Sequence, residues 1–236
     1  MNIIDVVIIL FILLIGVIGW HNGVIKTTVS AVGILIVFVL SFYLKNPIAE
    51  WLSLNLPFFN FWGDFKNVTI LNVIIYQLLS FIIVFSILMI IYGIVVKISS
   101  IIEKILKCTI ILGIPSKILG FIVGLIEGQI IVAVILMFLS LPIFEIDLVH
   151  ESTLKKFILE STPIVGNLSK NTSIATNEIM LLRDKFSSDS TKDEFNRNCL
   201  DIMLKYNIIE VDYANKLLSS GKLKISNYEE IINKYK

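Results

Sequence analysis

Residues 118–141 read ILGFIVGLIEGQIIVAVILMFLSL and contain a single charged side chain, that of Glu127. A helix needs about 20 mainly apolar residues to cross the hydrocarbon core of a bilayer, with a range of roughly 17 to 25. Nearly uncharged stretches of 18, 18 and 29 residues also occur at 3–20, 27–44 and 68–96. We therefore predict an all-α, polytopic membrane protein with four transmembrane helices.

The composition agrees with lipid as the main solvent of this chain. Its 236 residues are 56% hydrophobic and 17% charged, with a mean hydropathy of +0.87, which is outside the range of ordinary soluble domains. Only seven of the 20 Lys and Arg residues and five of the 19 acidic residues precede Phe144. We predict a transmembrane domain at 1–144 and a soluble α-helical tail at 145–236.

The segments between the spans carry different signals. The segment 46–67 is rich in aromatic residues, which suits a loop in the headgroup layer. Apolar residues recur at helical spacing within 97–112, with polar residues on the other face, which predicts an interfacial amphipathic helix.

The basic residues of the short loops predict an orientation. Positive residues favour the cytoplasmic side, and one side of the membrane would hold Lys26, Lys97, Lys104, Lys107 and Lys117. The other short loop offers only Lys45 and Lys66. We expect the first and third loops in the cytoplasm and both termini outside.

The tail shows short helical patterns, from which we expect roughly four helices with a hinge or loop at 187–190. Thr191 with Glu194, and Ser226 with Glu229, match the capping box that begins a helix. A further helix at 212–220 would end at Gly221.

Glycines with helical spacing predict close helix packing. Gly120, Gly124 and Gly128 recur every fourth residue within the fourth span, and Gly113 precedes them. Such a ladder lets another helix approach closely. The groove has two other interpretations, the lining of a conduit and the seam of a homo-oligomer. A second, less regular packing face follows from three glycines near the end of the first span, Gly16, Gly19 and Gly23.

Glu127 is the main intramembrane polar candidate, because it lies about 15 Å into its span at 1.5 Å per residue. A carboxylate at that depth should be neutral, paired or in contact with water. Gln77, or Asn72 nearer the interface, could hydrogen-bond it. An interhelical hydrogen bond and a proton or ion relay are the two interpretations. Asp5 is expected to accept from the free amides at the start of the first span.

Other chemistry has little support in the sequence. The net charge of +1 comes without a basic stripe, which argues against nucleic acid. Cys108 and Cys199, like His21 and His150, lack the spacing of metal ligands, so we predict no metal and no cofactor. No catalytic residues are proposed. The first span lacks a basic segment before it and a cleavage site after it, so we expect it to be retained.

These features together resemble the colicin V production protein family, CvpA, over about residues 1–145. The resemblance is carried by Asp5, by Gly19 and Gly23 before Lys26, and by the Lys117-Ile118-Leu119-Gly120 sequence that leads into the glycine ladder. Two positions depart from the family, which usually has a basic residue where His21 and Asn22 stand and often another where this chain has Glu127. The resemblance implies a bacterial inner-membrane protein linked to toxin or bacteriocin production and to envelope processes.

Three hypotheses of function follow. The first is a non-enzymatic scaffold or accessory factor whose tail recruits an unknown protein partner. The second is a small oligomeric channel or transporter with a polar path through Glu127 and Gln77. The third, an intramembrane enzyme, is disfavoured because the spans offer no paired acids and no nucleophile with a base.

Overall fold

The computed structural model describes residues 2–61, 68–108, 113–139, 152–185 and 192–235, and every regular element within them is an α-helix. This confirms the predicted all-α class. The helices are α1 (Ile3–Asn22), α2 (Val24–Asn55), α3 (Ile70–Cys108), α4 (Gly113–Leu139), α6 (Thr153–Ser161), α7 (Pro163–Lys185), α8 (Lys192–Lys205), α9 (Val211–Ser219) and α10 (Tyr228–Tyr235).

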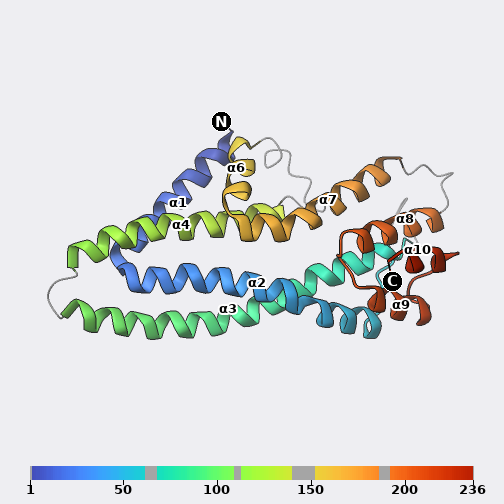
Figure 1. Cartoon of the computed structure of the whole chain (residues 1–236), viewed down its shortest axis with the longest axis horizontal. Helices are drawn as coiled ribbons and strands as arrows, with labels where there is room; N and C mark the ends of the chain where they lie inside the picture. Colours follow the sequence, from blue (N-terminus) through green and yellow to red (C-terminus); the bar gives the residue numbers. More distant parts are fainter. Residues whose placement is uncertain (1, 62–67, 109–112, 140–151, 186–191, 236) are drawn as a thin grey trace. The chain divides into compact units, whose positions relative to one another are not determined.

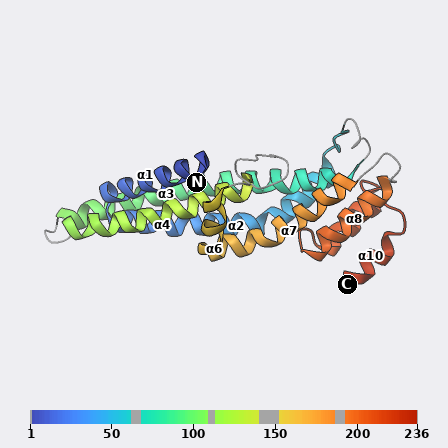
Figure 2. The same ribbon diagram turned by 90° about the horizontal axis from the view of Figure 1, so that it is seen from above.

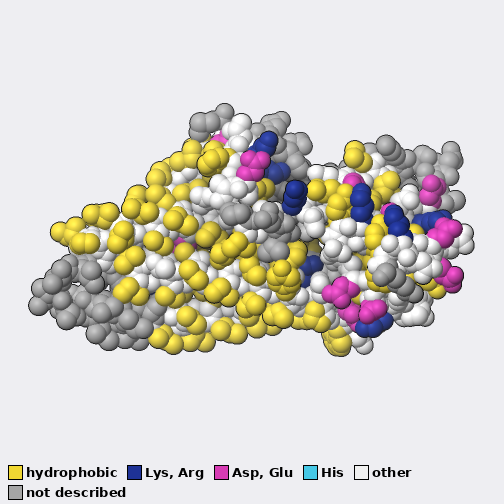
Figure 3. All heavy atoms as spheres, in the orientation of Figure 1, with side chains coloured by type: hydrophobic (Ala, Val, Ile, Leu, Met, Phe, Trp, Pro, Cys, Tyr) yellow, Lys and Arg dark blue, Asp and Glu magenta, His cyan; other side chains and the backbone are white. Residues whose placement is uncertain are grey.

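Within the described residues, four helices are long and apolar enough to cross a membrane, as predicted. They are Ile3–Asn22, Val24–Asn55, Ile70–Ile98 and Ile114–Leu139. Apolar side chains cover much of the visible surface of these helices, whereas charged side chains gather on the C-terminal helices (Figure 3). Large exposed residues such as Ile3 and Ile90, each 70% exposed, are expected to contact lipid.

The chain forms two compact units. The first comprises residues 1–41 and 85–169, and its core is the crossing of α1 and α4, which lie side by side (Figures 1 and 2). The short helix α6 contacts both of them.

A tight turn at Gly23 joins α1 to α2. Gly23 adopts a φ of 86°, which favours glycine, and its N–H donates to the carbonyl of Gly19 at 2.9 Å. The amide of Val24 has no partner within its own helix, and it donates to the Ser116 hydroxyl of α4 at 3.1 Å. The turn is thus held by a residue distant in sequence.

The second unit comprises residues 42–84 and 170–236. Its hydrophobic core combines residues of α8, α9 and α10 with Val68, which precedes α3, and with Ile70 and Val73 in the first turn of α3. Ile70, Val73, Leu200 and Met203 are completely buried. The tail helices therefore form one folded module together with the ends of α2 and α3.

The segment 46–67, expected to be a loop, is helical as far as Asn55 because α2 continues through Pro47. Proline cannot donate the hydrogen bond to the carbonyl four residues before it, so this helix loses one bond at that point. The burial of Ala49, Leu52 and Ser53 in the second unit stabilises the extension. Trp62 and Phe65 of the expected loop lie outside the described residues.

The candidate third span, Ile70–Ile98, agrees closely with the predicted 68–96, but two features near its ends were not predicted. Its first residues, beginning at Val68, are buried by protein. The residues expected to form a separate interfacial helix continue α3 without a break as far as Cys108. Residues 109–112 lie outside the described part, and the interfacial location stays a prediction.

Two of the tail helices end in the same way. Asn207 and Gly221 adopt positive φ values of 54° and 72° immediately after α8 and α9. The amides of Gly221 and Lys222 donate to the carbonyls of Leu218 and Leu217 at 3.1 Å, a Schellman motif. Gly221 therefore ends its helix as predicted.

The two predicted capping boxes have different outcomes. Helices do begin at Lys192 and Tyr228, close to both predicted positions. However, the Ser226 amide donates to Asp193 at 2.8 Å, and α10 begins only after Asn227. Thr191 and the predicted hinge at 187–190 lie outside the described residues.

Candidate functional site

The two glycine faces of the sequence are packed against each other within one chain. A Cβ atom added to Gly19 would lie 2.2 Å from the carbonyl oxygen of Gly120, and one added to Gly120 would lie 2.4 Å from that of Gly19. Gly124 is similarly close to Gly16, since its added Cβ would lie 3.0 Å from the Gly16 Cα. Both faces are needed for one contact, in which the backbones of α1 and α4 touch.

The contact continues at both ends of the ladder. A Cβ on Gly128 would meet the Ile12 Cα at 3.1 Å, and one on Gly16 would meet the Leu125 side chain at 2.7 Å. Gly113 is the first residue of α4. Because α1 of the same chain fills this groove, a homo-oligomer has to use another surface.

Glu127 takes part in a hydrogen-bond cluster formed by three membrane helices. The Ser30 hydroxyl of α2 donates to Glu127 Oε1, and the Ser30 and Tyr92 hydroxyls share a hydrogen bond of 2.5 Å. A Cβ on Gly33 would meet the Tyr92 ring at 2.8 Å, so this glycine makes room for the ring. The cluster links α2, α3 and α4 through polar atoms that lipid could not satisfy.

Gln77 and Asn72 bind other groups than Glu127. Gln77 Oε1 accepts from Lys45 Nζ at 2.5 Å. Asn72 Oδ1 accepts from the Phe59 amide at 2.6 Å and its Nδ2 donates to the Phe59 carbonyl at 3.2 Å, which ties the start of α3 to the end of the preceding segment. The expected pairing of Glu127 with either residue is thus replaced by separate contacts.

Asp5 joins the beginnings of two helices. Its Oδ2 accepts from the Asn2 amide and from the Thr153 hydroxyl, both at 2.9 Å. Its Oδ1 accepts from the Ser152 hydroxyl at 2.6 Å and from the Leu154 amide at 3.3 Å. A carboxylate with this many donors stabilises the N-termini of both α1 and α6. This arrangement is structural.

The basic residues used for orientation occupy the ends of the membrane helices. Lys26 Nζ of α2 donates to Asn22 Oδ1 of α1 at 2.8 Å, across the turn at Gly23. Lys97 and Lys117 are exposed. Lys104 and Lys107 belong to α3, but their side chains lie outside the described part of the chain.

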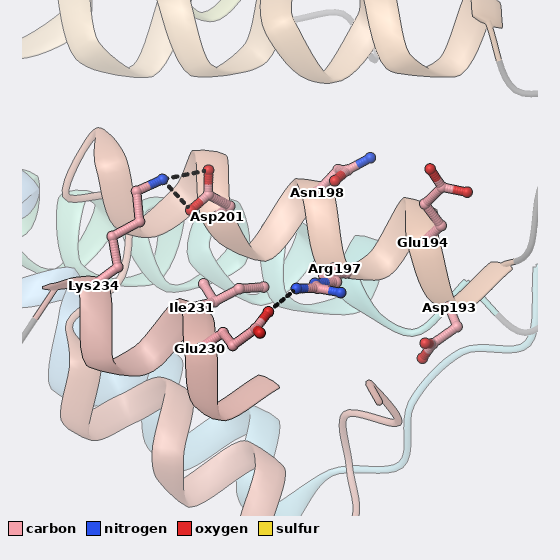
Figure 4. A pocket seen from close by; sticks show the side chains of 8 residues that line it. All are labelled: Asp193, Glu194, Arg197, Asn198, Asp201, Glu230, Ile231 and Lys234. Atoms are coloured by element: carbon pink, nitrogen blue, oxygen red, sulfur yellow. Dashed lines mark hydrogen bonds and ion pairs between the residues drawn. The ribbon is translucent and has the colours of Figure 1, made fainter. Parts of the chain in front are cut away.

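A charged groove lies between α8 and α10 (Figure 4). Two ion pairs cross it, Arg197 with Glu230 at 2.5 Å and Lys234 with Asp201 at 2.9 Å. Both pairs are largely exposed to solvent, so each contributes little to stability. Their role is to hold α10 on α8, while Asp193, Glu194 and Asn198 line the rest of the groove.

The buried thiol of the tail is a packing group. Burial raises the pKa of Cys199 to about 12, so the reactive thiolate is almost absent at neutral pH. Among the described residues, no group of three His, Cys, Asp or Glu side chains is placed to hold a metal ion. His21 is exposed at the end of α1, and His150 lies outside the described residues.

The distant hydrogen-bond partners of Glu127 and Asp5 were not predicted from the sequence. Ser30 and Tyr92 were not singled out, although each is a polar residue within an apolar span. Ser152, the partner of Asp5, lies 147 positions away. A search for every hydroxyl within the spans could have found the first two, but no local pattern reveals the third.

The fold defines a class, the multi-pass α-helical membrane proteins with a folded C-terminal helical module. The model of the family described as colicin V production protein matches residues 4–163. The chain belongs to this family. Comparisons with curated proteins and with solved structures found no match.

Proposed function

We propose that this chain is a non-enzymatic protein of the bacterial inner membrane that acts as a scaffold or accessory factor. Its process would be toxin or bacteriocin production, which the family description suggests, or another envelope function, which the resemblance implies. The observation that carries this proposal is the hydrophobic core shared by α8–α10 and the start of α3. A module attached in this way to membrane helices can hold a protein partner at the membrane.

The contacts of the polar residues support a role without catalysis. Glu127 and Asp5 each bind donors of neighbouring helices. Gln129 Nε2 of α4 donates to the Ser161 hydroxyl of α6 at 2.8 Å. Polar groups that are engaged in helix contacts stabilise the assembly and are poorly placed to attack a substrate.

The scaffold proposal predicts a partner of the tail in native membranes. We expect a photo-crosslinking residue at the exposed Asn198 to give one discrete protein adduct, identified by mass spectrometry. The same residue at Ile90, on the lipid-facing surface, is the matched control and should give lipid adducts only. If both positions gave only lipid adducts or crosslinks to the chain itself, recruitment of a protein partner by the surface around Asn198 would be excluded.

We further propose that the turn at Gly23, the end of α3 and the beginning of α4 face the cytoplasm, with both termini outside. The exposed Lys97 of α3 and Lys117 of α4 support this orientation. Alkaline phosphatase fused to the C-terminus should then be active, and a fluorescent protein inserted at 109–112 should fluoresce. Fluorescence of a C-terminal fluorescent fusion would reverse the assignment.

The alternative function is a small oligomeric channel or transporter. The cluster of Glu127, Ser30 and Tyr92 favours this alternative, because the two hydroxyls and the carboxylate could pass a proton along the cluster. This alternative predicts proton flux in proteoliposomes that falls to the level of empty liposomes in Glu127→Gln. Glu50→Gln, which removes a carboxylate paired with Lys216, should leave the flux unchanged. Flux that persists in Glu127→Gln would eliminate this path.

A further inference from the structure

Lys45 of α2 is a cation without a carboxylate partner among the described residues. Its Nζ donates to Gln77 Oε1 at 2.5 Å and lies 5.1 Å from the centre of the Phe42 ring. Lysines of the same unit do have such partners, since Lys216 pairs with Glu50 and Lys234 with Asp201. The half-buried ammonium of Lys45 has three N–H donors, and the amide oxygen accepts one of them.

Gln77 provides a second donor at the same place. Its side chain is only 6% exposed, and its Nε2 has no hydrogen-bond partner. A buried donor without a partner is costly, so such groups are normally satisfied by protein, water or ligand. Because Nε2 belongs to the amide whose oxygen binds Lys45, one ligand can contact both residues.

The two residues lie at the level expected for lipid headgroups. Lys45 directly follows the predicted hydrocarbon span of α2 at 27–44. The candidate span Ile70–Ile98 has 29 residues, or about 43 Å at 1.5 Å per residue, which exceeds the ~30 Å hydrocarbon core. The tail helices bury Val68, Ile70 and Val73 near its beginning, so the part that lipid can surround starts after Val73, about one helical turn before Gln77. Tyr43 is 63% exposed beside Lys45, and interfacial tyrosines are typical of this layer.

We propose that Lys45 and Gln77 bind the phosphate of an anionic phospholipid headgroup. The phosphate supplies the negative charge that Lys45 lacks and several oxygen acceptors, of which one or two can accept from Lys45 Nζ and Gln77 Nε2. Water could satisfy the amide but would leave the ammonium without a counter-charge. This site is independent of the scaffold proposal, because it concerns only the lipid contact of the second unit.

The test is a titration of the purified full chain in mild detergent, followed by native mass spectrometry. Phosphatidylcholine carries the same phosphate, but its own choline cation neutralises the charge. Phosphatidylglycerol should therefore bind about tenfold more tightly, because its net negative charge is available to balance Lys45. Lys45→Met, which keeps the apolar stem, should lose this preference, and Lys45→Arg should retain it. Lys26→Met removes a lysine at the other end of the same helix and should leave the preference intact.

The Gln77→Glu variant distinguishes the loss of the lipid site from the misfolding of the chain. The new carboxylate would itself pair with Lys45, so this variant should bind phosphatidylglycerol about tenfold more weakly while its thermal transition stays the same or rises. Equal binding of the two lipids by the wild-type chain would overturn the proposal. An equal loss in Lys26→Met and Lys45→Met would do so too, as it would indicate unspecific charge attraction.

Inorganic phosphate distinguishes the source of the anion. If the ligand is a lipid headgroup, millimolar inorganic phosphate should neither displace phosphatidylglycerol nor shift the thermal transition. A shift that occurs in the wild-type chain and is absent in Lys45→Met would identify free phosphate as the ligand and overturn the lipid assignment.

Discussion

Gly19→Ala is expected to destabilise the contact between α1 and α4 by about 3 kcal/mol, at the upper end of what overpacking of a tight core costs. The added Cβ would lie 2.2 Å from the Gly120 carbonyl oxygen and 3.0 Å from its carbonyl carbon. Both are backbone atoms, so no side-chain rotation can relieve the clash. The helices would have to separate, and the close contacts at Gly124 would be lost with them. Unfolding of the purified chain by increasing mole fractions of SDS in mild detergent measures this change.

Gly93→Ala is the matched control for this substitution. Gly93 lies within α3, and a Cβ added there meets nothing within 4 Å. Alanine is the better helix former by roughly 0.5–1 kcal/mol, so this variant should be as stable as the wild-type chain or slightly more so. A Gly19→Ala variant as stable as Gly93→Ala would show that the glycine faces do not meet.

Leu200→Ala is expected to lower the free energy of unfolding of the second unit by about 2–5 kcal/mol, the range for a leucine truncated in a closed core. Leu200 is completely buried and shares its core with Val68, Ile70 and Val73. The cavity should therefore loosen α8 and the beginning of α3 together. Hydrogen exchange followed by mass spectrometry would detect faster exchange in peptides from both segments.

Leu181→Ala is the corresponding control, since Leu181 of α7 is 59% exposed. Surface substitutions of this kind usually change stability by less than about 0.5 kcal/mol. Faster exchange in α8 with unchanged exchange at residues 68–73 of α3 would contradict a common core.

The sequence predicted the number and approximate positions of the membrane helices because their signal is local. Any run of 20 apolar residues carries it, and the glycine spacing likewise reveals a packing face within one helix. Which helix occupies that face is not a local property. Gly19 and Gly120 are 101 positions apart, and neither stretch of sequence contains information about the other.

The ends of α2 and α3 illustrate a related limit. Val68, Ile70 and Val73 are apolar whether lipid or protein surrounds them, so hydropathy includes them in the third span and does not reveal that the tail helices bury them. The predicted second span ends at residue 44, but α2 continues through Pro47 because burial of the following turns outweighs the one lost hydrogen bond.

The partner of Glu127 illustrates the same limit for the candidate site. Counting residues gave the depth of this carboxylate in its span, and Gln77 was chosen because its depth is comparable. Depth does not fix the direction in which a side chain points around the helix axis. The side chains of Ser30, Tyr92 and Glu127 meet on the facing sides of their helices, and only the assembled structure reveals this.

The glycine contact also has a consequence for biogenesis. The ribosome makes α1 about 100 residues before the part of α4 that covers it, and at roughly 5–20 residues per second this interval lasts about 5–20 seconds. Throughout that time the newly inserted first helix has a backbone groove open to lipid or to other proteins of the insertion machinery. The order of synthesis thus delays the contact between α1 and α4 until about half of the chain has been made.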